Sequence, residues 1–235
     1  TTEIYTLSLH DALPICLQVA RDVDLAEFTG GHVHIMHISK IQSLLHVRHG
    51  KARGVKVTCE VTPHHLTLTD EELLGYNTCA KVNPSLGTVD DREALIDALL
   101  DGTVDCIATD HAPHTDIEKD QPINDAPFGM IGLETAFAAL YTHLVLPGRV
   151  PLTLLIQKMT AGPAGVLHLQ PRGTLEPGAP ADVTIINLDR RWKVTRDAFL
   201  SKSSNSPYIG REFQGRVDTT IVGGRVVYSD GRIVV

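Results

Sequence analysis

The sequence has no long apolar run. No uninterrupted apolar stretch approaches the roughly 20 residues that a membrane-spanning helix needs, and the first residues lack the basic start and apolar core of a secretory signal peptide. A cluster of Lys and Arg is also missing, because 21 basic residues stand against 28 acidic ones and the formal net charge is −7. These absences predict a cytoplasmic protein with neither a membrane nor a nucleic acid as its partner.

Cysteine is scarce and histidine is abundant. The four cysteines are widely spaced and form no CxxC pair, which predicts reduced thiols: Cys16, Cys59, Cys79 and Cys106. Twelve histidines are present, several of them beside Asp, Pro or β-branched residues. Imidazole titrates near neutral pH and is a common metal ligand, so this composition favours metal or acid–base chemistry.

The first fifteen residues, TTEIYTLSLHDALPI, resemble the conceptual translation of a sequencing-library adapter. We therefore expect residues 1–15 to be a non-native segment and the natural protein to begin further upstream. The alternative is a native amphipathic segment.

Periodic patterns begin near Gly31. Short β-branched or alternating runs predict strands over residues 32–39, 55–61 and 104–108. Apolar positions at helical spacing predict helices over residues 40–50 and 90–100. Strands that alternate with helices in this way predict an α/β fold with parallel strands and right-handed crossovers.

Two Ser/Thr-x-x-Glu/Gln patterns predict capping boxes. Ser39 with Gln42 would open the first of these helices, and Thr69 with Glu72 would open a brief helix further along.

Polar residues follow each predicted strand. His37, the pair His64 and His65, and Asp110 with His114 all fall at carboxyl ends, where a (β/α)₈ TIM barrel places its chemistry. A doubly wound sheet obeys a similar rule and remains open, although no glycine-rich phosphate loop follows any strand.

The composition changes after Gly173. Helices are predicted over residues 133–144 and 151–159 and near 163–167, whereas strand-like runs follow, with Gly223-Gly224 as a hairpin turn. We expect residues 16–172 to form part of a barrel and residues 173–235 to form a small, incomplete β-sandwich-like domain.

His37 is the first candidate metal ligand. Alternation along a strand places Val33, Ile35 and His37 on one face and His34 on the other, so His34 and His37 do not chelate one ion together. We expect His37 to be the last interior-facing position, where it would bind zinc. The alternative is a hydrogen-bonded structural histidine.

Asp110 is the second candidate, because an acidic residue directly after an apolar strand suits a cation or a proton transfer. A carboxylate beside a metal-bound water can orient that water and accept its proton. A helix cap or a loop salt bridge is the alternative. Since a zinc centre needs at least three protein ligands, the others would come from outside this sequence.

Weaker signals lie in three loops. His64 and His65 suit a supporting or a solvated role, Asn83 with Pro84 suits a turn, and residues 126–129 suit a rigid loop whose N–H groups meet a substrate. Lys81 and Lys119 lie in these loops without a motif of their own.

Six blocks in this order resemble the C-terminal part of dihydroorotases, in the amidohydrolase superfamily: HIMHIS, EVTPHHLTLT, KVNP, DCIATDHAPH, APFGMIGLET and SKSSNSPYIGREFQG. Hydantoinases and allantoinases share the first block but tend to carry a TCP-type motif where this chain has EVTPHH. The resemblance implies a metal-dependent hydrolase barrel and the reversible, zinc-dependent cyclisation of N-carbamoyl-L-aspartate to L-dihydroorotate in pyrimidine (UMP) biosynthesis.

The resemblance also implies residue roles around a pair of zinc ions. His37 would be a zinc ligand, and Asp110 would be both a zinc ligand and the catalytic acid–base. The substrate contacts would be Asn83, His114 and the backbone of Phe128 and Gly129.

Departures from the family accompany the resemblance. Ser85-Leu86-Gly87 stands where the family usually has Pro-Leu-Arg, and the family's HxH pair, bridging carboxylate and a further histidine lie upstream of this sequence. We therefore expect the chain alone to be inactive and prone to aggregation.

Two other functions remain open. One is a hydantoinase- or allantoinase-type cyclic amidohydrolase. The other is a non-catalytic dihydroorotase-like subunit that scaffolds aspartate transcarbamoylase. A homodimer is the further assembly that the resemblance suggests.

Overall fold

The computed structural model describes the backbone of residues 2–169 and 171–234, with side chains from residue 15 onward within those ranges. Of the adapter-like segment predicted for residues 1–15, Thr1 and the side chains of residues 2–14 lie outside the described part. The described backbone of this segment is helical and continues without a break in α1 (Thr2–Thr29). No helix in the described part of the chain combines the length and apolar character that a membrane crossing requires.

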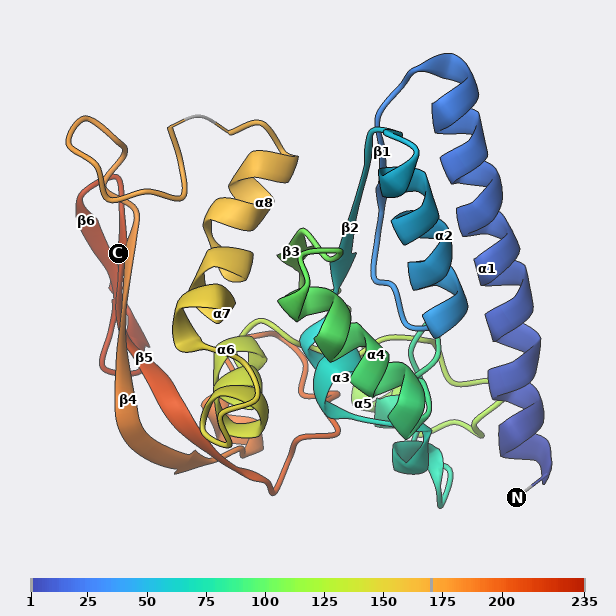
Figure 1. Ribbon diagram of the computed structural model, residues 1–235. Coiled ribbons are helices and arrows are strands. Elements are labelled where there is room, and N and C mark those ends of the chain that lie inside the picture. Colours follow the sequence, from blue (N-terminus) through green and yellow to red (C-terminus); the bar gives the residue numbers. More distant parts are fainter. Residues whose placement is uncertain (1, 170, 235) are drawn as a thin grey trace.

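A parallel three-stranded sheet forms the first half of the fold. β1 (Val33–Ile35), β2 (Val57–Val61) and β3 (Cys106–Ile107) lie in the order β1-β2-β3, and both pairs are parallel. This confirms the predicted strand–helix–strand order, although β1 and β3 are shorter than predicted. Because the strands are parallel, their carboxyl ends meet at one edge of the sheet (Figure 1).

Three long helices cover one face of this sheet. α1 packs beside α2 (Ile41–Ala52), and α4 (Val89–Leu100) packs beside α2 in turn. The close contact between α1 and α2 depends on Gly50, because a Cβ atom there would lie 2.6 Å from Val23 Cγ1. The apolar core between the helices and the sheet consists of side chains such as Val19, Val23, Leu44, Val47, Cys59, Val61, Leu95 and Leu99.

The face assignment of β1 needs a correction. Val57 lies 3.4 Å from a Cβ atom built at Gly50 of α2, so its face of the sheet meets the helices. Val33 pairs with Val57 in register and shares that face. The prediction that this face is the barrel interior is therefore wrong. His32 and His34 share the opposite face, as predicted, and both contact the Thr58 hydroxyl, at 2.9 and 2.8 Å.

Neither predicted capping box is present. α2 has Lys40 at its N-cap with no side-chain cap, and the Ile41 N–H instead donates to Asp91 Oδ1 at 3.1 Å. Thr69 precedes the 3-10 helix η1 (Asp70–Leu73), again without a side-chain cap. A carboxylate on a neighbouring helix has replaced the local cap that the Ser39–Gln42 pattern predicted.

Shorter helices follow the strands and connect the two halves of the molecule. They are α3 (Pro63–Thr67), η2 (Thr78–Ala80), α5 (Asp116–Lys119), α6 (Ala136–Leu140) with the π-helical turn η3 (Tyr141–Val145), α7 (Leu152–Met159), α8 (Ala161–Val166) and η4 (Arg196–Ala198). Their positions agree with the helices predicted near residues 133–144, 151–159 and 163–167.

An antiparallel sheet forms the carboxyl-terminal part. β4 (Val183–Lys193), β5 (Glu212–Val222), β6 (Arg225–Ser229) and β7 (Arg232–Ile233) lie in that order. Gly223 and Gly224 join β5 to β6 with φ of 55° and 79°, the left-handed conformations that the predicted two-residue hairpin turn needs.

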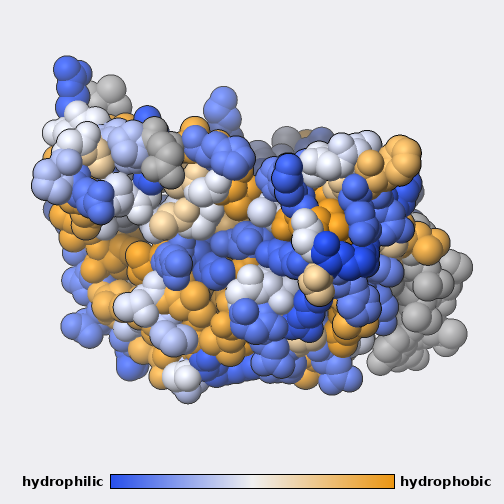
Figure 2. Space-filling model, turned by 45° about the horizontal axis from the view of Figure 1, so that its top comes forward, coloured by the Kyte–Doolittle hydropathy of each residue, from blue (hydrophilic) through white to orange (hydrophobic). Residues whose placement is uncertain are grey.

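The antiparallel sheet contacts α6 through glycine. A Cβ atom at Gly215 of β5 would lie 3.0 Å from the rings of Phe137 and Tyr141. Exposed apolar side chains remain on this sheet, among them Ile185, Val222, Val226 and Ile233. Figure 2 shows apolar side chains gathered on the left side of the molecule, where this sheet lies.

Candidate metal and substrate site

The predicted ligands lie at the carboxyl edge of the parallel sheet. His37 follows β1 and Asp110 follows β3, whereas His64, predicted only in a supporting or solvated role, lies in α3 directly after β2. His37 and Asp110 have φ of 39° and 47°, left-handed conformations that residues other than glycine rarely adopt. Such conformations cost energy and cluster at functional sites, so both residues are held in place by the fold around them.

His37 offers a nitrogen without a partner. Its Nδ1 atom is buried and makes no hydrogen bond among the described residues, and the same is true of His64 Nε2. Burial lowers the pKa of His64 well below its usual value, and the neighbouring charges of His65 and His37 lower it further. The lowered pKa favours the neutral form of His64, the form in which histidine binds metals.

The Asp110 carboxylate is equally unengaged. No described residue donates a hydrogen bond to it or forms a salt bridge with it, so the structure supports neither the helix cap nor the loop ion pair considered above. One strand separates β1 from β3, so His37 and Asp110 follow strands that are roughly 10 Å apart. An imidazole nitrogen and a carboxylate that have no partner among the described residues are the kinds of ligand that zinc accepts.

A cavity of about 500 Å³ adjoins His37. It also touches Asn83, which is exposed, and His34, and its other wall is α1. Asn83 and His37 therefore line one space, as a ligand and a substrate contact would.

A second group contains the remaining predicted substrate contacts. His114 Nε2 lies 2.9 Å from the carbonyl oxygen of Phe128, and the Gly129 N–H donates to the Lys81 carbonyl at 2.8 Å. Gly129 has φ of 128°, and a Cβ atom there would lie 2.6 Å from Ala112 Cβ. The structure therefore brings His114, Phe128 and Gly129 together and ties them to the residues before Asn83.

Two lysines that sequence patterns passed over fix this loop. Lys119 is 5% exposed, and its Nζ donates to the Pro127 carbonyl at 2.8 Å. Burial lowers the pKa of Lys119 to about 8. Lys81 Nζ donates to the Ala126 carbonyl at 2.6 Å and lies 4.4 Å above the Phe128 ring. Only their position in polar loops hinted at these roles.

The loop before α4 shows how the chain accommodates its Gly87. A Cβ atom at Gly87 would lie 2.5 Å from Asp91 Cβ, so no larger residue fits without movement. The positive charge beside the Asp91 carboxylate comes from Lys40, whose Nζ lies 3.4 Å from Oδ2. Lys40 therefore forms an ion pair with the same carboxylate that leaves no room for a side chain at residue 87.

His34, Glu60 and Cys106 form a further cluster on the inner face, with potential ligand atoms within 4.8 Å of one another. Both His34 nitrogens are already engaged, with Thr58 Oγ1 at 2.8 Å and Glu60 Oε2 at 3.2 Å. Burial, followed by the charge of Glu60, raises the pKa of Cys106 to about 12. The cluster is therefore satisfied as a histidine–carboxylate pair beside a neutral thiol.

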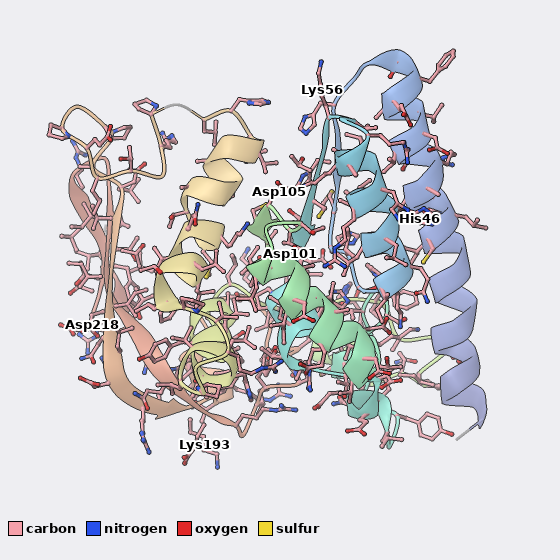
Figure 3. The ribbon with its side chains drawn as sticks, viewed as in Figure 1. His46, Lys56, Asp101, Asp105, Lys193 and Asp218 are labelled. Atoms are coloured by element: carbon pink, nitrogen blue, oxygen red, sulfur yellow. The ribbon has the colours of Figure 1, made fainter. Side chains whose placement is uncertain are left out.

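Residues at the amino end of the parallel sheet stabilise the fold. Figure 3 labels Lys56 and Asp105, which precede β2 and β3. The Asp105 carboxylate accepts from Lys51 Nζ at 2.8 Å and from the Cys59 N–H at 2.8 Å, so it ties α2 to both strands.

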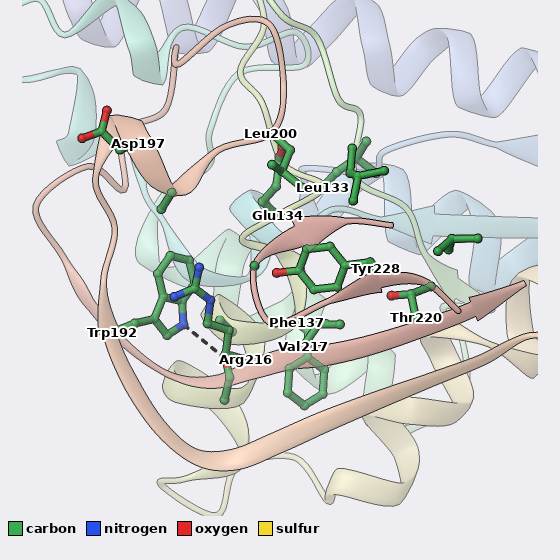
Figure 4. Close-up of a pocket in the computed structure, with 16 residues that line it drawn as sticks. Leu133, Glu134, Phe137, Trp192, Asp197, Leu200, Arg216, Val217, Thr220 and Tyr228 are labelled. Atoms are coloured by element: carbon green, nitrogen blue, oxygen red, sulfur yellow. Dashed lines mark hydrogen bonds between the residues drawn. The ribbon is translucent and has the colours of Figure 1, made fainter. Parts of the chain in front are cut away.

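Another cavity, of about 490 Å³, lies between α6 and the antiparallel sheet (Figure 4). Phe137, Val217 and Tyr228 line it, and Trp192 closes one end through an Nε1–H bond to the Gly215 carbonyl at 3.3 Å. Its lining is largely apolar and contains none of the predicted site residues.

Comparison with known proteins identifies the class. Residues 20–227 match the model of the Amidohydrolase family, and the chain belongs to this family of metal-dependent hydrolases. The chain is 53% identical over 214 residues to the dihydroorotase of Pelotomaculum thermopropionicum, covering 91% of this chain and 50% of that protein. It is 49% identical over 211 residues to the dihydroorotase of Latilactobacillus sakei, covering 90% and 49%. It thus spans about half the length of these relatives.

Solved structures agree on the fold. The L-hydantoinase (dihydropyrimidinase) of Arthrobacter aurescens superimposes with a TM-score of 0.89 at 26% identity, over 100% of this chain and 56% of that one. The D-hydantoinase of a Thermus species gives 0.87 at 25% identity, over 93% and 49%. The predicted family resemblance, and the predicted α/β fold with a small β part, are confirmed.

Proposed function

We propose that this chain is the carboxyl-terminal half of a dihydroorotase, which interconverts N-carbamoyl-L-aspartate and L-dihydroorotate in pyrimidine biosynthesis. The observation that supports it most is the pair of unengaged donors, His37 Nδ1 and the Asp110 carboxylate, at one sheet edge of a chain about half identical to dihydroorotases. The sequence difference from the hydantoinases, EVTPHH in place of a TCP-type motif, favours the same substrate.

We propose residue roles that this geometry supports. His37 and Asp110 would hold zinc, and the remaining ligands of a two-zinc centre would come from the other half of the protein. Zinc, when bound, polarises the ring amide carbonyl and lowers the pKa of water. In the hydrolytic direction the Asp110 carboxylate accepts the proton of the attacking water and passes it to the leaving ring nitrogen.

Substrate binding falls to the residues around the cavity and the loop. Asn83 donates from its exposed amide, and the backbone of Phe128 and Gly129 forms the rigid wall. His114 would hold the substrate carboxylate by a hydrogen bond, and the Phe128 carbonyl orients its ring.

Alternatives and partners rest on weaker support. The structural likeness to hydantoinases favours a cyclic amidohydrolase of that type. The chain is, however, 26% identical to the L-hydantoinase and 53% identical to a dihydroorotase. A non-catalytic subunit on aspartate transcarbamoylase would not need His37 and Asp110.

We propose a homodimer or such a transcarbamoylase complex as the assembly. Unpaired thiols at the four cysteines support the cytoplasm as its location.

The test is to recover the coding sequence upstream of Cys16 and express the complete protein. We expect an extension of roughly 200 residues, which a full barrel needs, that contains an HxH pair. The purified protein should contain zinc and turn over L-dihydroorotate but neither hydantoin nor allantoin. Turnover of hydantoin alone would establish the alternative enzyme. An extension without metal ligands would favour the non-catalytic subunit. If the recovered gene itself encodes residues 1–15, the prediction that they are a non-native segment is wrong.

The role of Asp110 has its own test in that protein. Asp110→Asn should lower kcat by about 10²- to 10⁴-fold, the usual contribution of a general acid–base. Asp116→Asn is the matched control, because Asp116 is an exposed carboxylate six residues away that pairs only with Arg196. An Asp110→Asn variant with normal kcat would contradict the assignment.

A further inference from the structure

A polar segment from the carboxyl-terminal part reaches the candidate site. Residues 201–206, with the sequence SKSSNS, lie between η4 and β5 and contact the loops after β3 at alternate positions. Ser201 Oγ donates to Glu134 Oε1 at 2.5 Å and lies 3.4 Å from His111 Nε2. Ser203 Oγ donates to the His114 carbonyl. The alternation indicates an extended strap with one side on the site.

Asn205 makes the central contacts of this strap and is 2% exposed. Its Nδ2 donates to the Ala112 carbonyl at 3.0 Å and to the Gly129 carbonyl at 3.1 Å. Its Oδ1 accepts from the His114 N–H at 3.1 Å and lies 2.5 Å from Ser203 Oγ. One buried amide therefore joins the turn after Asp110 to the loop that contains Phe128 and Gly129.

The backbone of Asn205 adds to this connection. Its carbonyl accepts from the Ile131 N–H at 3.0 Å, so both its side chain and its main chain bind the 128–131 loop. Ala112 and Met130 are themselves joined, because the Ala112 N–H donates to the Met130 carbonyl at 2.9 Å. The two loops behave as one unit with Asn205 at its centre.

We propose that Asn205, supported by Ser203, is a positioning residue that fixes His114 and Gly129 for substrate binding. The proposal rests on the proposed function, in which these two residues contact the substrate. Asn205 itself touches neither His37 nor Asp110 among the described contacts, so its effect is on substrate affinity rather than on metal binding.

The amide group is required by its chemistry. An Asn side chain offers two N–H donors and one carbonyl acceptor, and here each finds a partner of the complementary kind. An aspartate of the same shape would turn a carboxylate oxygen toward the carbonyls of Ala112 and Gly129. Two acceptors would then face each other in a buried place, which costs more than the lost bonds alone.

The experiment compares four variants of the complete protein. Asn205→Asp should raise the KM for dihydroorotate by about 10- to 100-fold, the usual effect of losing a residue that orients a site. Zinc content should stay unchanged. Amide hydrogen exchange should accelerate at Ala112, His114 and residues 129–131, a readout that needs no activity. Lys202→Ala, an exposed change in the same segment, should leave both quantities at the wild-type value.

Variants of Ser203 provide a second test of the proposal, which applies even if Asn205→Asp does not fold. Ser203→Ala removes the hydroxyl that contacts His114 and Asn205, and should raise both KM and amide exchange, whereas Ser203→Thr keeps the hydroxyl and should restore them. Unchanged KM and exchange in Asn205→Asp, or in Ser203→Ala, would overturn the proposal. Altered exchange in a protein without dihydroorotase activity would instead refute the proposed function and leave the positioning role standing.

Discussion

Backbone conformation distinguishes the site residues from their neighbours. His37 and Asp110 adopt left-handed φ directly after their strands, and Gly129 adopts φ of 128°. Their position after an apolar run made His37 and Asp110 candidates, and the family resemblance supplied the roles that we propose for them. Asn205 and Lys119 escaped prediction, since their partners lie 76 and eight residues away and no local pattern marks them.

A methyl group at Gly129 should disrupt the substrate loop. Gly129→Ala places a Cβ atom 2.6 Å from Ala112 Cβ and forces a side chain into a conformation that costs roughly 1–3 kcal/mol. We expect a lower unfolding free energy and a higher substrate KM in the complete protein. Gly165→Ala is the control, because it lies in α8 with open space around it and should be neutral or stabilising. Equal effects of the two changes would show that the loop tolerates a side chain.

Helices and strands were predictable where the pattern is local. Alternation over residues 55–61 and helical spacing over residues 90–100 correspond to β2 and α4. The capping box predicted at Ser39 is wrong, because Asp91 of α4 accepts the hydrogen bond from the Ile41 N–H. No local sequence rule reveals a partner 50 residues away. The prediction of which face of β1 points into the barrel was wrong for a related reason. Only the position of α2 shows which side of β1 meets the helices.

Acid should weaken the anchoring of α3. Burial lowers the pKa of His65 to about 4 from its ordinary 6.5. Its ring lies 2.8 Å from Thr62 Oγ1 and 3.0 Å from the Pro84 carbonyl. The unfolded state therefore binds a proton that the folded state does not, and stability should fall by up to about 3 kcal/mol as pH drops from 6.5 to 4.

Chemical denaturation between pH 4 and 7 measures this slope, with His65→Gln as the comparison. Glutamine retains an N–H donor for Pro84 but does not titrate, so the variant should be less stable at pH 7 and should lose less stability on acidification. Parallel pH profiles for the two proteins would exclude His65 as the titrating group.

The whole molecule has two incomplete surfaces. β1 and β3 are the edges of the parallel sheet as far as the structure describes it, and apolar side chains remain exposed on the antiparallel sheet. Unpaired strand edges and apolar surfaces favour association between chains. The two ligands that we propose, His37 and Asp110, are also fewer than a zinc centre needs.

The separately expressed chain should therefore self-associate and turn over no dihydroorotate. Sedimentation analysis should show oligomers, and zinc should bind at less than one ion per chain. Co-expression with the amino-terminal half of a dihydroorotase relative should increase the monomer or dimer fraction and restore zinc. A soluble, active chain with stoichiometric zinc would refute both the incompleteness and the proposed division of the site.

Asn205 lies 76 residues after the Gly129 that it holds. A ribosome adding about 5–20 residues per second needs roughly 4–15 s to cover that interval. Throughout that time the nascent chain carries the 128–131 loop and the turn after Asp110 with only their direct contacts, such as the Ala112 N–H bond to the Met130 carbonyl, and without Asn205. The positioning that we propose for Asn205 is therefore acquired late in translation, when the strap emerges, and a chain released before residue 205 would carry His114 and Gly129 without it.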